Sequence, residues 1–103
     1  MKEEINLKTI SFKLVETVEE LGKKLANFYK TEMEYTTFYN KRLLRSGMAT
    51  QALKEAEVLE GLKLEPIYEK YQTLKLEIKL LYMRVEVYKE VSRNIRSLAF
   101  NDI

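Results

Sequence analysis

The last third of the chain carries side chains that recur at alternating spacings of four and three residues over about four heptads. This seam consists of Ile67, Tyr71, Leu74, Ile78, Leu81, Val85, Tyr88, Ser92, Ile95 and Ala99. The pattern predicts a long helix that packs lengthwise against another helix. A second apolar stripe follows nearly the opposite side of the same helix and consists of Leu76, Leu80, Met83 and Val87. Because one partner helix cannot cover two opposed faces, we expect this second stripe to be an interface between copies of the chain in a homo-oligomer.

The first part of the chain predicts the partner helix. Its apolar positions are Leu7, Ile10, Leu14, Val18, Leu21, Leu25 and Phe28, with one slip from the heptad spacing. Beyond that point the stripe becomes largely aromatic and continues through Tyr29, Met33, Tyr35, Phe38, Tyr39 and Leu43. We expect Tyr71 and Tyr88 to be core residues whose hydroxyls reach the edge. For Tyr29, Tyr35 and Tyr39, both core packing and stacking on nucleic-acid bases are open.

Turn-forming residues are concentrated between these two segments. We predict helices over residues 9–45, 50–60 and 66–100 within a single domain, 1–103. Gly47 is then expected to follow the first helix with a positive φ, Thr50 to cap the second, and Pro66 to lie in the first turn of the third. The predicted fold class is all-α: a long antiparallel helical hairpin with a short connecting helix, assembling into an oligomeric helical bundle.

The residue types present exclude most enzyme chemistry. The chain has no His and no Cys, and its three Gly form no phosphate-binding loop. Acidic pairs such as Glu32 with Glu34 stand two residues apart, so on a helix they point in different directions. We therefore predict no catalytic site, no metal site and no cofactor, and do not expect an enzyme. The absence of a leader pattern and of a membrane-length apolar run predicts a cytoplasmic protein with no membrane partner.

A line of basic residues borders the seam of the last helix. At the same four-three spacing it contains Lys75, Lys79, Tyr82, Glu86, Lys89, Arg93 and Arg96. In one interpretation the cations follow nucleic-acid phosphates and Tyr82 stacks on a base. In the other, the line is a solvated flank paired with Glu, with cations favoured near a helix C-terminus. The same alternatives apply to a second cluster at the end of the first helix, formed by Lys41, Arg42 and Arg45.

The order of segments resembles a group of small helical phage recombination accessory proteins, related in layout to the recombination mediators of T-even phages. The resemblance is carried by a long first helix (LGKKLANFYKTEMEYTTFYNKRLL), a short acidic helix (TQALKEAEVL) and a long closing helix (YQTLKLEIKLLYMRVEVYKEVSRNIRSLAF). It implies an oligomeric single-stranded-DNA-binding protein that helps load a recombinase onto DNA coated by single-strand-binding protein, in the host cytoplasm. The basic terminal turn of that group matches Lys89, Ser92, Arg93 and Arg96.

A structural or adaptor role is the alternative. A helical bundle that serves as a virion scaffold or as a protein–protein interaction module needs only the two apolar faces of the last helix. It makes no demand on the basic line, so nucleic-acid binding separates the two hypotheses.

Overall fold

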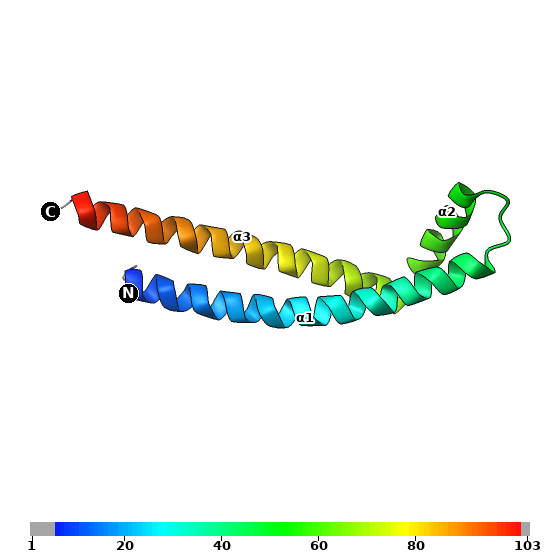
Figure 1. Cartoon of the computed structure of the whole chain (residues 1–103), viewed down its shortest axis with the longest axis horizontal. Coiled ribbons are helices and arrows are strands. Elements are labelled where there is room, and N and C mark those ends of the chain that lie inside the picture. The colour runs from blue at the N-terminus through cyan, green and yellow to red at the C-terminus, as the bar shows by residue number, and fades with distance from the viewer. Residues whose placement is uncertain (1–5, 102–103) are drawn as a thin grey trace. The chain divides into compact units, whose positions relative to one another are not determined.

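The computed structural model describes residues 6–101, which form three helices (Figure 1). Helix α1 runs over Leu7–Arg45, α2 over Gln51–Leu62 and α3 over Pro66–Asn101. Residues 6–101 contain no strand, so the prediction of an all-α hairpin-like fold with a short connecting helix is confirmed. The described residues divide into two compact units, one joining residues 6–24 with residues 77–101, the other spanning Leu25–Leu76.

The first unit is an antiparallel pair formed by the start of α1 and the later part of α3, blue against orange and red in Figure 1. The predicted seam of α3 is its buried face here. Ile78, Leu81, Val85 and Ser92 are all buried. They pack against α1 because a four-three spacing keeps one face of each helix turned toward the other along its length.

The face that α1 presents to this seam differs from the sequence prediction. Val18, expected in the core, is 50% exposed, and Thr17 is buried in its place at 5%. With Thr17 the series from Ile10 to Leu21 keeps the heptad spacing and the predicted slip does not occur. The Thr17 hydroxyl donates to the Lys13 carbonyl at 2.8 Å, which satisfies the hydroxyl and allows its burial.

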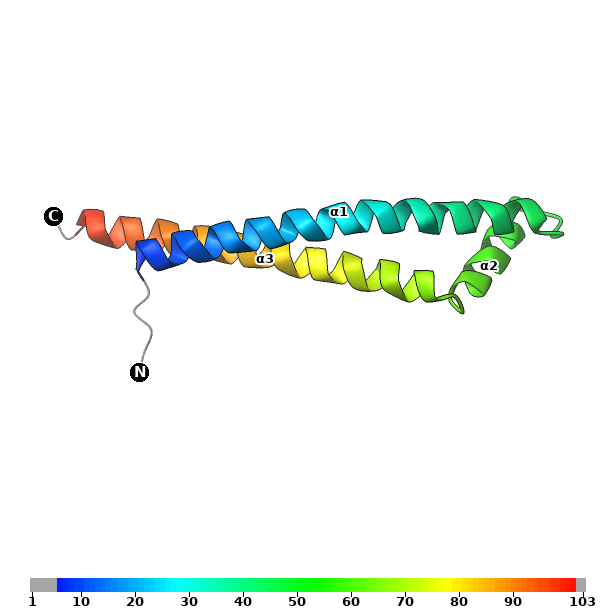
Figure 2. The ribbon, with the colours of Figure 1, turned by 90° about the horizontal axis from the view of Figure 1, so that it is seen from below.

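The second unit consists of the rest of α1, all of α2 and the start of α3, and Figure 2 shows α2 beside the end of α1. Val58 and Leu62 anchor α2 in the core of this unit. The Tyr71 ring is stacked between Phe28 and Tyr35, with centroids 5.4 and 4.5 Å away. Such offset aromatic pairs add stability beyond the area that they bury.

The aromatic prediction for this unit is correct in part. Tyr71 lies at the core edge and its hydroxyl donates to a Glu32 carboxylate oxygen at 3.3 Å, as expected. Tyr29, Met33 and Phe38, which were expected to continue the apolar stripe, are instead exposed. The face is completed by Thr31, which is fully buried and is separated from Phe28 by the heptad spacing of three.

The helix ends follow local hydrogen bonding. Thr50 caps α2 as predicted, its hydroxyl accepting from the Leu53 N–H at 3.2 Å, and α3 begins at Pro66. The prediction for Gly47 is wrong, because no glycine in residues 6–101 has a positive φ. Helix α1 ends instead with the Ser46 N–H donating to the Leu43 carbonyl at 3.3 Å. Since that bond tightens the last turn, no left-handed residue is required there.

Candidate functional site

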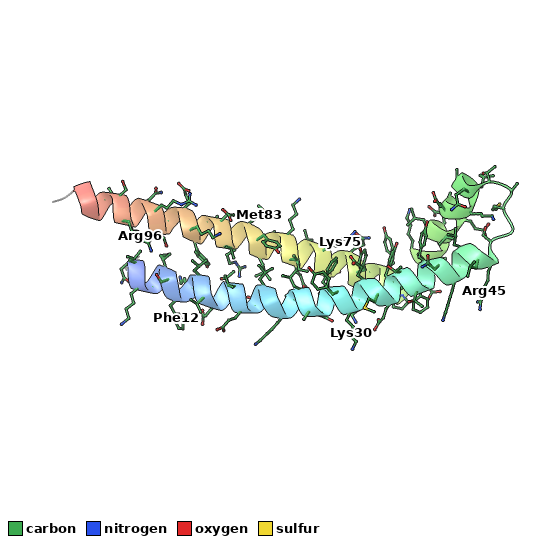
Figure 3. The ribbon with its side chains drawn as sticks, viewed as in Figure 1. Phe12, Lys30, Arg45, Lys75, Met83 and Arg96 are labelled. Atoms are coloured by element: carbon green, nitrogen blue, oxygen red, sulfur yellow. The ribbon has the colours of Figure 1, made fainter. Side chains whose placement is uncertain are left out.

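The second apolar stripe of α3 is exposed to solvent. In the first unit Leu80 is 51%, Met83 55% and Val87 57% exposed, and Leu76 continues the row in the second unit. Figure 3 places Met83 on the side of α3 that faces away from α1. The row is contiguous because spacings of four and three keep its members on one helix face. A contiguous exposed apolar row is unusual on a monomer and is characteristic of an interaction surface.

Charged groups of both signs border this apolar row. A hollow of about 250 Å³ beside Leu80 is lined by Glu20, Lys24, Glu77 and Arg84. The Lys24 Nζ lies 2.7 Å from a Glu77 carboxylate oxygen. The hydrogen bond and charge of Glu77 raise the pKa of Lys24. The border of the row is therefore polar and mixed in charge around an apolar centre, as in protein interfaces.

Helix α1 also presents apolar residues outside the seam. Phe12, Val15 and Val18 are each half or more exposed, and Figure 3 shows Phe12 directed away from α3. Sequence reasoning missed this surface because it placed Val18 in the core. An unbroken heptad that accepts Thr17 would have revealed it, since it moves Val18 out of the seam.

The basic line of α3 is partly neutralised by its own helix. Lys89 pairs with Glu86 at 3.4 Å and Arg93 with Glu90 at 3.1 Å, both as exposed pairs three residues apart. Because such pairs are worth little in water, they leave both cations available to a stronger anion.

The other members of the line differ from one another. The Lys75 ammonium lies 4.4 Å from the centroid of the Tyr71 ring, a cation–π contact within the second unit. Lys79, Tyr82 and Arg96 are exposed, and neither cation has an ion-pair partner in the described part of the chain. The line thus contains two unpaired cations and an exposed ring, with paired cations between them.

The cluster at the end of α1 lies in the second unit, where α1 faces α2. Arg42 forms a close ion pair with Glu65, while Lys41 and Arg45 are exposed without an ion pair to any residue in 6–101.

No group of three or more acidic side chains within residues 6–101 is placed to hold a metal ion. None of the helices in this range combines the length and the apolarity that crossing a membrane requires.

Comparison with known proteins gave no match to a protein-family model, to a curated protein or to a solved structure.

Proposed function

We propose that this chain is a non-enzymatic, self-associating helical module that serves as a structural or adaptor bundle. The observation that carries the proposal is the row of Leu80, Met83 and Val87, each more than half exposed on the outer face of α3. Burying such side chains is the main driving force for association. The occupant that best fits the row is a second copy of the same row.

The charges around the row favour a second copy over an unrelated apolar partner. A two-fold axis brings each surface onto its own equivalent, so a border must be self-complementary. Arg84 on one copy can meet Glu20 or Glu77 on the other, since both signs line the hollow beside Leu80. A border of one charge would instead repel its copy.

Thiol cross-linking tests this arrangement directly. The chain has no Cys, so a single introduced thiol reports one position. We expect Met83→Cys to give a cross-linked dimer with a short thiol-reactive linker at low protein concentration. Lys23→Cys is the matched control and should remain monomeric. Position 23 is exposed on α1, and because it is two residues from the buried Leu21 it points in a different direction from the buried face. Equal cross-linking of both variants, or none of Met83→Cys, would refute the proposed face.

A second candidate function is a cytoplasmic single-stranded-DNA-binding recombination accessory protein of phage type, acting with a recombinase or a single-strand-binding protein. The observation that favours it is the unpaired, exposed set on α3 formed by Lys79, Tyr82 and Arg96. Cations at helical spacing can follow a phosphate backbone, and an exposed tyrosine can stack on any base. This binding would be non-specific in sequence and compatible with self-association.

Fluorescence anisotropy with a labelled single-stranded oligonucleotide tests this second function. Affinity should fall steeply with salt and be similar for different sequences. Replacing Arg93 and Arg96 together by Ala should weaken binding and flatten the salt slope by about one to two units. Helicity should not change, because both side chains are exposed. No binding at low salt and high protein concentration would eliminate this candidate and leave the adaptor function standing.

A further inference from the structure

A cavity of about 650 Å³ lies in the second unit between the end of α1 and α2. Its lining includes three cations of α1, Lys41, Arg42 and Arg45, and one anion of α2, Glu57. The volume is within the range of pockets that hold small organic ligands. This concentration of positive charge around a cavity is independent of the apolar row on α3.

The three cations border the cavity for a structural reason. Lys41 and Arg45 are four residues apart and Arg42 is three residues from Arg45, so neighbouring turns of α1 carry them. Arg42 is held in place by its ion pair with Glu65, and it lies across Gly61, where a Cβ would overlap its guanidinium. The glycine thus allows α2 to approach and fixes one wall of the cavity.

The other two cations, Lys41 and Arg45, are not held by an ion pair of this kind. Lys41 and Arg45 are exposed and have no ion-pair partner within residues 6–101. Compensation of the α1 dipole accounts for basic residues in a last turn, but it does not require them to border a cavity. An ammonium and a guanidinium at the border of one cavity favour a phosphate there, which a guanidinium can bind through two parallel hydrogen bonds.

The other residues that line the cavity fit a ligand with more groups than a simple anion has. The Phe38 ring is 45% exposed and gives the cavity an apolar surface on which a flat ring can stack. Glu57, whose carboxylate accepts a long hydrogen bond from the Ser46 hydroxyl at 3.4 Å, can accept further hydrogen bonds from a ligand. A ligand that complements the cavity has a phosphate, a flat ring and hydrogen-bond donors.

We propose that this cavity binds a nucleotide, with the phosphate on Lys41 and Arg45, the base on Phe38 and a hydroxyl or amino group on Glu57. The nucleotide can be free or part of a single strand, because both present the same chemistry. The site belongs to the second unit and does not depend on self-association or on the basic line of α3.

Nuclear magnetic resonance provides a direct test, because the chain has only three glycines and their amide signals are readily distinguished. Gly61 lines the cavity, and Gly22 lies in the first unit as an internal control. Adenosine 5′-monophosphate should shift the Gly61 signal saturably and leave Gly22 unmoved. Adenosine, which lacks the phosphate, and inorganic phosphate, which lacks the ring, should each bind more weakly.

Two double variants separate this cavity from general electrostatics. Replacing Lys41 and Arg45 by Ala should weaken adenosine 5′-monophosphate binding by about tenfold or more, because two charge-assisted contacts are removed. The charge-matched control, Arg93 and Arg96 replaced by Ala, should leave binding unchanged. Both variants should fold, since all four replaced side chains are exposed, and circular dichroism verifies this.

The same titrations distinguish a free nucleotide from a nucleotide within a strand. If a short single-stranded oligonucleotide shifts the Gly61 amide signal, whether or not adenosine 5′-monophosphate also shifts it, the site binds a strand. A response to the monophosphate alone assigns it to free nucleotide. No saturable shift of Gly61 with either ligand overturns the proposal. Inorganic phosphate binding as tightly as the monophosphate, or equal binding by the Lys41 and Arg45 double variant, also overturns it.

Discussion

Leu80→Glu should break self-association while leaving the helices intact. Leu80 is 51% exposed, so about half of the roughly 1.5–3 kcal/mol available from burying a leucine remains to be gained on assembly. A two-fold dimer gains this amount twice, about 2 kcal/mol in total, so truncation to Ala alone should raise the dimer Kd about 30-fold. A carboxylate buried in the interface adds a desolvation cost that the neighbouring Arg84 offsets only in part, and the Glu variant should be weakened at least about a hundredfold.

The isolated chain should tolerate the same change. Leu and Glu have similar helix propensities, and position 80 is half exposed. Sedimentation velocity should therefore give the mass of one chain for Leu80→Glu, with helical circular dichroism retained. Lys23→Gln is the matched control, because it lowers the net charge by the same amount at an exposed position of α1. A wild-type mass for Leu80→Glu, with helicity intact, would refute the interface.

Three further predictions concern the folded chain itself. Thr31 is fully buried and its hydroxyl has no hydrogen-bond partner within residues 6–101, so Thr31→Val should raise the free energy of unfolding by about 1 kcal/mol. Thr17→Val should not raise it, because the Thr17 hydroxyl makes a hydrogen bond that the substitution removes. Denaturant titration of the two variants measures the difference. Gly22→Ala should stabilise by about 0.5–1 kcal/mol, since a Cβ there meets nothing within 4 Å; a lower melting temperature would indicate an unseen close contact. Burial, and then Glu32, raise the pKa of Tyr71 in the folded chain. The Tyr71 hydroxyl therefore loses its proton more easily in the unfolded chain, and the free energy of unfolding falls as pH rises above the ordinary tyrosine pKa of about 10. Tyr71→Phe removes this ionisation, so it should lose less helicity at high pH than Tyr29→Phe, which replaces an exposed tyrosine.

The fold of α3 could be predicted from the sequence almost completely. The seam from Leu74 to Ser92 is buried except for Tyr88, which is partly exposed, because a sustained heptad leaves only one face for a partner helix. The helix boundaries are within two residues of those expected, since Thr50 and Pro66 are strong local signals.

The register of α1 could not be predicted from hydrophobicity alone. Thr17 and Thr31 occupy buried heptad positions, while the more hydrophobic Val18 and Met33 are exposed. A threonine can enter a helical core when its hydroxyl bonds to the preceding turn, as Thr17 does, and a hydropathy pattern does not record that bond. The exposed apolar surface of α1 was missed for the same reason.

The candidate sites were accessible to sequence reasoning only in part. Helical spacing places Leu80, Met83 and Val87 on one face, and it also identifies the cations of α1. The cavity between α1 and α2 depends on Gly61, whose missing side chain accommodates the Arg42 guanidinium. That approach joins two segments of different helices, so no local pattern in either one predicts it.

The mass of the unmodified chain in solution tests the central claim most directly. Sedimentation equilibrium from the low to the high micromolar range should show a reversible shift from one chain to a dimer or a larger assembly, because the exposed row of α3 is covered only by association. A mass of 12.3 kDa throughout that range would contradict the account, since it would mean that the row remains in water.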